Sequence, residues 1–177
     1  MEIVKANGLN PLLRLLQSPD PSSICAAVSC VRNLTAQPPN NSPIIKAGFL
    51  QPLVNLLSFK DNENTQWHAA TALNNLAANA KNRREIVNAG VVQSIKELVL
   101  ETPVRVQIQM AGCIKNLSLG GMYPPFNHLL KSHPPLGELN SRLSEIGISE
   151  VLILLTNSPN REVQRKSNAA LQNLRDK

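Results

Sequence analysis

The chain has 177 residues, of which 42% are hydrophobic and only 3% aromatic, and it carries a formal net charge of +6. Leu, Ile, Val and Ala supply most of the apolar content, which favours stacked helices over sheet sandwiches. The charge is too small and too dispersed for a nucleic-acid-binding protein, and no apolar run approaches the ~20 residues of a membrane span. Three scattered cysteines indicate a reducing compartment without a disulfide framework.

Four units of similar sequence follow one another along the chain. Each unit opens with a short apolar segment, at residues 2–7, 43–48, 85–90 and 142–147. A second apolar run follows at residues 11–16, 52–57, 94–99 and 151–155, and a third block closes each unit at residues 31–34, 73–76, 114–117 and 171–174. The recurrence of the same three segments predicts three helices per unit, the first short and the last long.

Local signals support these helices. Glycine or asparagine ends each first segment, where the chain needs a residue that tolerates a left-handed backbone. These residues are Asn7, Gly48, Gly90 and Gly147. Pro11 and Pro52 fall in the first turn of the second helix, where their missing N–H leaves no bond unmade. In residues 69–76 and 110–117, apolar or small side chains recur at steps of three and four, which predicts a stripe that faces the core.

Each third block carries an asparagine at the same place. These residues are Asn33, Asn75, Asn116 and Asn173, and their separations are 42, 41 and 57 residues. The first two separations match the period of roughly 40–47 residues that two- or three-helix solenoid repeats show. We therefore divide the chain into repeats at residues 1–40, 41–81, 82–138 and 139–177.

The order of short helix, Gly, Pro-x-Leu-Val-x-Leu-Leu, long helix and Asn-Leu resembles the armadillo family over the whole chain. Stretches at residues 2–9, 31–34, 42–45, 53–57, 61–63, 73–78 and 152–156 resemble in particular the fungal vacuolar members of that family. The resemblance implies an all-α, right-handed armadillo superhelix of about four three-helix repeats. Stacked third helices would line its concave face, which is the usual binding surface of such solenoids.

The resemblance also implies a function. It is that of a non-enzymatic adaptor that tethers partner proteins at the cytosolic face of the vacuole membrane. The processes implied are vacuole inheritance, vacuole fusion, nucleus–vacuole contact and cytoplasm-to-vacuole or autophagy traffic. A generic armadillo scaffold in another pathway, such as ubiquitin ligation or adhesion signalling, and a truncated product without independent activity remain the alternatives.

The asparagines and their neighbours are the candidate binding residues. An Asn amide both donates and accepts, so the row could hold the backbone of an extended partner segment. Alternatively, these amides only satisfy backbone groups between repeats. The residues before them should line the same face: Arg32, Asn74, Lys115 and Gln172. Arg32 and Lys115 suit an acidic or phosphorylated segment, unless both cations are merely solvated, and Asn74 departs from the Arg that the resembled family favours there.

Other functional classes have little support. A nuclear-import carrier of the armadillo type presents Trp four residues before each Asn, where this chain has Ser29, Thr71, Gly112 and Ala169. Trp67 lies off that row, so we do not expect a carrier of basic localisation signals. Residues 81–84, the densest basic run, are interpreted as a solvated helix start. His128 and His133 lack Cys or carboxylate neighbours, and the sequence predicts neither a metal, a cofactor nor a catalytic site.

The third repeat is longer than the others, and the surplus falls at residues 121–136. Two Pro pairs bracket this segment, which predicts a loop. It could be a binding loop with Tyr123 and Phe126 as anchors. We favour a retained intron, because residues 121–123 can be encoded with a common fungal donor sequence and removal of 16 codons leaves 41 residues between Asn116 and Asn173.

The end units have no neighbours on one side. We expect apolar residues there to lose contacts, and these are Leu9, Leu12, Leu171 and Leu174. This predicts a marginally stable or self-associating chain that looks cut from a longer array. The lipid anchor that the resemblance implies would lie outside this chain, which alone would be cytoplasmic.

Overall fold

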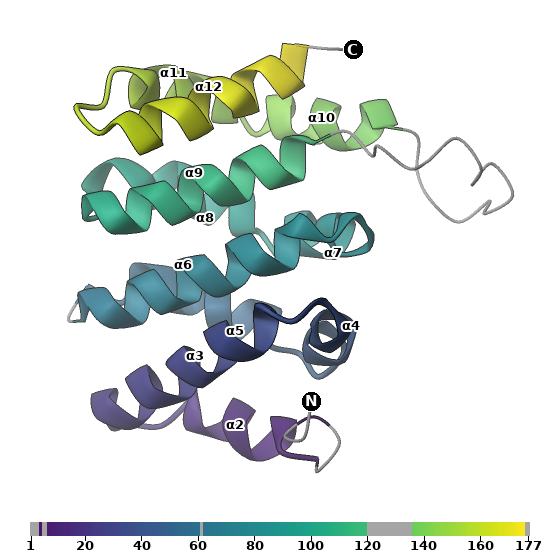
Figure 1. Ribbon diagram of the computed structural model, residues 1–177, viewed down its shortest axis with the longest axis vertical. Helices are drawn as coiled ribbons and strands as arrows, with labels where there is room; N and C mark the ends of the chain where they lie inside the picture. Colours follow the sequence, from purple (N-terminus) through teal and green to yellow (C-terminus); the bar gives the residue numbers. More distant parts are fainter. Residues whose placement is uncertain (1–3, 5–6, 61, 120–135, 176–177) are drawn as a thin grey trace, which may run out of the picture.

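The computed structural model describes residues 4, 7–60, 62–119 and 136–175, and every regular element within them is a helix (Figure 1). The first unit contains α2 (Leu9–Leu15) and α3 (Pro21–Thr35). The second contains α4 (Pro38–Lys46), α5 (Leu50–Asn55), the 3-10 helix η1 (Leu56–Ser58) and α6 (Glu63–Ala78). The third contains η2 (Ala80–Asn82), α7 (Arg83–Asn88), α8 (Val91–Leu98), η3 (Val99–Glu101) and α9 (Val104–Ser118). The fourth contains α10 (Leu136–Glu145), α11 (Ile148–Thr156) and α12 (Arg161–Arg175).

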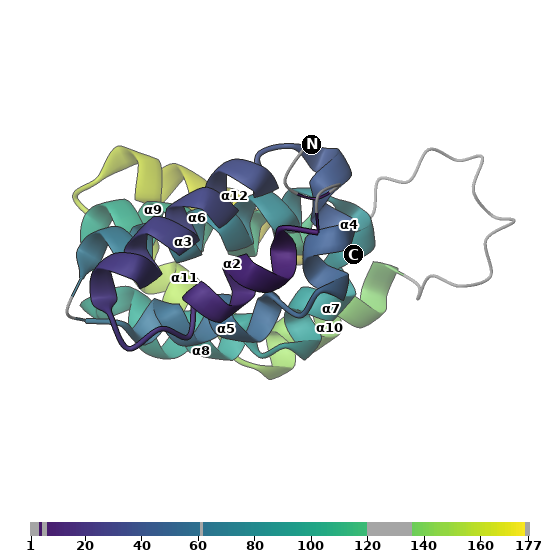
Figure 2. The same ribbon diagram turned by 90° about the horizontal axis from the view of Figure 1, so that it is seen from below.

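The long third helices form the spine of the molecule. α3 packs against α6, α6 against α9, and α9 against α12. Figure 2 shows these helices along one side, with α5 and α8 along the other and α4, α7 and α10 at one end. We call the exposed surface of α3, α6, α9 and α12 the third-helix face. The stack confirms the predicted all-α armadillo solenoid.

The predicted turns and caps explain where the helices end. Positive φ angles occur at the residues that separate the first and second helices: Asn7 (57°), Gly48 (88°), Gly90 (79°) and Gly147 (73°). At the start of α3, the Asp20 side chain accepts hydrogen bonds from the backbone N–H groups of Ser22 and Ser23 (3.3 and 2.9 Å). Asn62 caps α6 by accepting from the Thr65 N–H (3.1 Å). Each cap satisfies N–H groups that have no partner inside the helix.

One continuous apolar core runs through the units. The stripes predicted on α6 and α9 are buried, as steps of three and four residues require. The prediction of uncovered leucines at the two ends is wrong. Leu9, Leu12, Leu171 and Leu174 are only 8–9% exposed, because all four belong to the continuous apolar core. Among the described residues of the two end units, the exposed large apolar side chains are instead Leu15 (47% exposed), Ile153 (50%) and Leu154 (55%), and self-association stays a prediction.

The interpretation of residues 81–84 as a solvated helix start also needs correction. Asn82 and Arg83 are buried. Asn82 Nδ2 donates to the Leu76 carbonyl (3.1 Å), and Arg83 donates through Nε to the Ala77 carbonyl (3.2 Å) and through Nη1 to the Leu119 carbonyl. The physical reason is that carbonyl groups at the C-terminal ends of α6 and α9 lack helical partners and need donors.

The predicted insertion at residues 121–136, with Tyr123 and Phe126, lies outside the described residues except for Leu136, the first residue of α10. The choice between a binding loop and a retained intron therefore stays open. The repeat boundaries assigned from the sequence likewise stay a prediction.

Candidate functional site

The eight residues predicted to bind a partner lie on the third-helix face, near the C-terminal ends of its helices. They are Arg32 and Asn33 on α3, Asn74 and Asn75 on α6, Lys115 and Asn116 on α9, and Gln172 and Asn173 on α12. Asn33 and Gln172 are exposed and the other six are partly buried. Stacking of the helices thus brings together residues that lie one repeat apart in the sequence, and partner binding by them stays a prediction.

Two of the asparagines tie their helix to the preceding one in the same way. Asn75 Nδ2 donates to the Arg32 carbonyl (3.4 Å) and to Thr35 Oγ1 (3.3 Å). Asn173 Nδ2 donates to the Lys115 carbonyl (3.3 Å) and to Ser118 Oγ (3.2 Å). In both cases the amide nitrogen contacts the backbone carbonyl of the residue just before the asparagine of the preceding repeat. It also contacts a side-chain hydroxyl three residues after that carbonyl, on the same helix.

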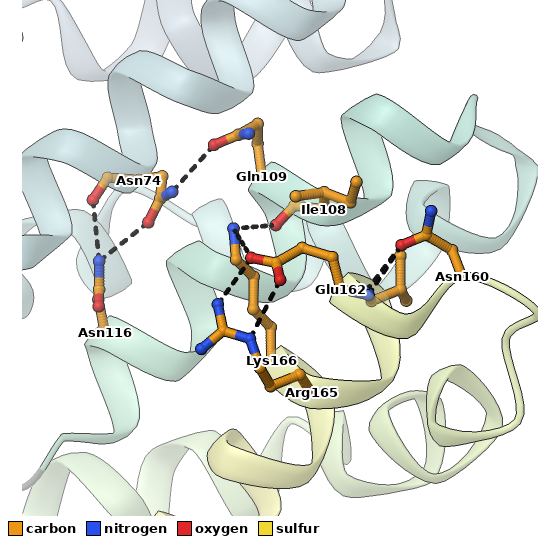
Figure 3. A network of polar contacts seen from close by, with 9 residues as sticks. Asn74, Ile108, Gln109, Asn116, Asn160, Glu162, Arg165 and Lys166 are labelled. Atoms are coloured by element: carbon orange, nitrogen blue, oxygen red, sulfur yellow. Dashed lines mark hydrogen bonds and ion pairs between the residues drawn. The ribbon is translucent and has the colours of Figure 1, made fainter.

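Asn116 follows the same rule with one replacement. Its Nδ2 donates to the Asn74 carbonyl (3.2 Å), but Ala77 stands where the other repeats have a hydroxyl. The second bond goes to Asn74 Oδ1 (2.9 Å), and Asn74 Nδ2 in turn donates to Gln109 Oε1 (3.0 Å), as Figure 3 shows. Asn74 therefore supplies the acceptor that Ala77 lacks and adds no cation to the face.

These contacts bear on the two interpretations of the asparagine row. The amide nitrogens of Asn75, Asn116 and Asn173 are used between repeats, as the alternative interpretation states. Among the described residues, none donates a hydrogen bond to the Oδ1 atoms of these three side chains. A partner backbone would therefore meet carbonyl oxygens, which accept from N–H groups, and any ladder would work through them.

The third helices carry most of the net positive charge of the chain. They contain seven basic and two acidic residues: Arg32, Arg105, Lys115, Arg161, Arg165, Lys166 and Arg175 against Glu63 and Glu162. This excess accounts for nearly all of the net charge of +6. A surface of this sign attracts acidic partner segments and repels basic ones.

Some of these cations are held by contacts within the chain (Figure 3). Arg165 Nη2 lies 2.7 Å from Glu162 Oε1, and Lys166 Nζ lies 3.6 Å from the same oxygen. Lys166 Nζ also donates to the Ile108 carbonyl on α9 (3.2 Å), and desolvation lowers the pKa of Lys166 in spite of the nearby carboxylate. Among the described residues, Arg32 and Lys115 have no acidic partner within salt-bridge distance.

A cluster around Trp67 lies on the same face. The Arg32 guanidinium carbon lies 5.1 Å from the Trp67 ring centroid, and that of Arg105 lies 5.6 Å away. The His68 ring is 4.9 Å from the Trp67 ring. Desolvation, followed by the charges of Arg32 and Arg105, lowers the pKa of His68, so this side chain is neutral at pH 7. Three consecutive third helices, α3, α6 and α9, thus contribute to one cationic and aromatic cluster.

Sequence reasoning did not include Trp67 or Arg105 in the site. Trp67 stands eight residues before Asn75, and Arg105 stands eleven before Asn116. On a helix, positions eight and eleven residues before an asparagine lie on the same face, and so in the same stripe, as the position four residues before it. Extension of that stripe by two further turns would have found both residues, but it could not have shown that they meet Arg32.

Other kinds of site find no support in the part of the chain that the structure describes. No group of three or more His, Cys, Asp or Glu side chains there could hold a metal ion. Burial raises the pKa of the Cys113 thiol to about 12, which leaves it protonated and unreactive. Among the described helices, none combines the length and apolarity that crossing a bilayer requires.

Comparison with known proteins agrees with this architecture. The sequence pattern of the Armadillo/beta-catenin-like repeat family matches residues 1–36 and 38–78. Vacuolar protein 8 of Yarrowia lipolytica is 48% identical over 178 aligned residues, which cover 100% of this chain and 28% of that protein. Vacuolar protein 8 of Schizosaccharomyces pombe is 45% identical over 98% of this chain and 29% of its own length. The chain therefore spans less than a third of these relatives.

A solved structure gives the same fold and carries a ligand. A designed armadillo repeat protein in complex with the peptide (KR)4 superposes with a TM-score of 0.82 at 26% identity, over 97% of this chain and 66% of that one. The designed protein binds a basic peptide, whereas the third helices of this chain are themselves basic.

Proposed function

This chain is an armadillo-repeat protein that resembles about 28% of the length of fungal vacuolar protein 8, and from this premise we propose that it is a non-enzymatic, protein-binding adaptor. It holds extended segments of partner proteins on the third-helix face, through Arg32, Lys115 and the Oδ1 atoms of Asn75, Asn116 and Asn173. One observation carries the proposal: within the part of the chain that the structure describes, Arg32 and Lys115 lack an acidic partner on this face, and the Oδ1 atoms of three asparagines there, Asn75, Asn116 and Asn173, accept no hydrogen bond.

The sign of the charge argues for acidic partners. Arg32 and Lys115 are partly buried and have no described acidic partner, so each would gain a charge-assisted hydrogen bond from a carboxylate. A basic partner would instead meet like charge on three of the four third helices. A carrier of basic localisation signals would also need free aromatic faces, and here Arg32 and Arg105 already lie against Trp67.

The likeness to vacuolar protein 8 supports a place of action. We propose that the full protein tethers its partners at the cytosolic face of the vacuole membrane, in vacuole inheritance, vacuole fusion, nucleus–vacuole contact and autophagy traffic.

Affinity capture from fungal lysate tests the adaptor function. The baits are the wild-type chain, an Arg32→Glu/Lys115→Glu variant, and an Arg14→Glu/Lys46→Glu variant that makes the same change in charge. Arg14 and Lys46 are exposed and lie on α2 and α4, away from the third-helix face. Circular dichroism establishes that all three baits have equal helical content.

We expect the wild type and the Arg14→Glu/Lys46→Glu control to retain vacuole-membrane proteins that Arg32→Glu/Lys115→Glu loses. Equal capture by all three baits would show that partners do not use this face. Retention of proteins from another pathway, with loss in the same variant, would keep the scaffold and replace the vacuolar assignment.

A further inference from the structure

Arg32, Trp67 and Arg105 come from three successive repeats and meet on the third-helix face. All three side chains are partly buried. A guanidinium group is attracted to the electron-rich face of an indole, and this attraction holds both arginines beside the ring. The ring therefore positions two positive charges that would otherwise move apart by repulsion.

The two arginines differ in what they contact. Arg32 Nη2 donates to Asn33 Oδ1 on its own helix (2.6 Å), which is a neutral acceptor. Arg105 pairs through Nε with the carboxylate of Glu63 and through Nη2 with Asn64 Oδ1 (2.9 Å). The side chains of Arg105 and Glu63 are 42% and 46% exposed, so water competes with this pair.

The positive field of the cluster is not cancelled by these contacts. The charges of both arginines add to desolvation in lowering the pKa of the adjacent His68. Glu63 is the single carboxylate within salt-bridge distance of either arginine among the described residues. Its contact with Arg105 also shows that this guanidinium can bind a carboxylate in its present position.

We propose that Arg32, Trp67 and Arg105 form a subsite for one Asp or Glu side chain of an extended partner segment, and that Glu63 is the internal competitor for this subsite. The partner carboxylate takes the place of Glu63 on Arg105 and reaches the unpaired side of Arg32, while Trp67 forms the wall between them. The inference rests on the proposed function, because it names the chemistry that the third-helix face selects.

Trp67 is the single tryptophan of the chain, so its fluorescence reports on the subsite directly. The probes are the peptides acetyl-(Ser-Glu)5-amide and acetyl-(Ser-Gln)5-amide, which differ in charge and little in shape. Calorimetry gives the affinity of each peptide, and Trp67 fluorescence shows whether binding reaches the cluster. Both are measured at low salt, where charge pairing contributes most.

Substitutions of Arg105 and of Glu63, which pair with each other, should change the affinity for the Glu peptide in opposite directions. Arg105→Gln should weaken binding of the Glu peptide about tenfold, the size of one lost charge-assisted hydrogen bond. Glu63→Gln should strengthen it about two- to fivefold, because a surface ion pair no longer has to be broken. Lys60 and Glu101 form a second exposed pair at 3.1 Å, so Lys60→Gln and Glu101→Gln are matched controls that should change the affinity less than about twofold.

The proposal is supported if the Glu peptide alone changes the Trp67 fluorescence and if the two variants shift the affinity in opposite directions. Equal affinities in the wild type, Glu63→Gln and Arg105→Gln, with a loss in Arg32→Glu/Lys115→Glu, would overturn this subsite and leave the proposed function standing. Binding of neither peptide would also overturn it, and lysate capture would then decide the proposed function separately.

Discussion

Gly112 on α9 lies against the Asn74 side chain, and its replacement by alanine tests how tightly the repeats are joined. An added Cβ would lie 2.9 Å from Asn74 Nδ2 and 3.2 Å from both Cγ and Oδ1. Asn74 would have to move, but its amide donates to Gln109 (3.0 Å) and accepts from Asn116 (2.9 Å). The substitution therefore sets a local gain in helix propensity against the loss of contacts between α6 and α9.

The magnitudes predict which effect prevails. Alanine in a helix interior is favoured over glycine by about 1 kcal/mol. Displacement of Asn74 removes two hydrogen bonds of about 1 kcal/mol each. We therefore expect Gly112→Ala to lower the free energy of unfolding by about 1 kcal/mol. In an Asn74→Ala background the clash is absent, and the same substitution should raise the free energy of unfolding by about 1 kcal/mol.

Equilibrium urea unfolding of the wild type, both single variants and the double variant measures this coupling, with far-ultraviolet circular dichroism as the signal. The decisive observation is the change of sign between the two backgrounds. If Gly112→Ala stabilised the wild-type chain as it does the Asn74→Ala chain, the close contact with Asn74 would carry no energy and the reasoning would be refuted.

Three further predictions follow from single side chains. The folded-state pKa of His68 lies below 6.5, so the stability of the fold should decrease as the pH drops below about 6.5. In thermal unfolding between pH 7 and pH 5, the His68→Gln variant should lose less stability than the wild type. Equal losses in the two proteins would contradict this prediction. Burial raises the pKa of Cys113 to about 12, so its thiol should react with thiol reagents at pH 8 only after unfolding. Peptide mapping measures the labelling of each cysteine. Labelling of Cys113 as fast as that of the other two cysteines would contradict its burial. Arg83→Met should lower the free energy of unfolding by about 2 kcal/mol, because helix-end carbonyls lose their donor, whereas the exposed Arg84→Met should change little.

The order of elements and their inward faces could be predicted because both depend on short-range patterns. Steps of three and four residues identify the buried stripe on α9, and Gly48 and Gly90 stand where the backbone turns left-handed. The repeat period placed Asn75 and Asn116 on equivalent turns of α6 and α9. Each of these features follows from backbone geometry within a few residues and needs no knowledge of neighbouring repeats.

What a side chain contacts across repeats depended on the tertiary structure. The rotation of each repeat relative to the last one decides that Asn116 meets Asn74 and that Arg105 approaches Trp67, and no sequence period encodes that rotation. Arg83 looked solvated because its neighbours in sequence are polar, yet the ends of two helices bury it. The sequence by itself determined the helices, the turns and the inward face. The stacking of the repeats decided which polar side chains join neighbouring repeats and which remain open to a partner. The physical reason is that contacts between repeats form between residues about forty positions apart.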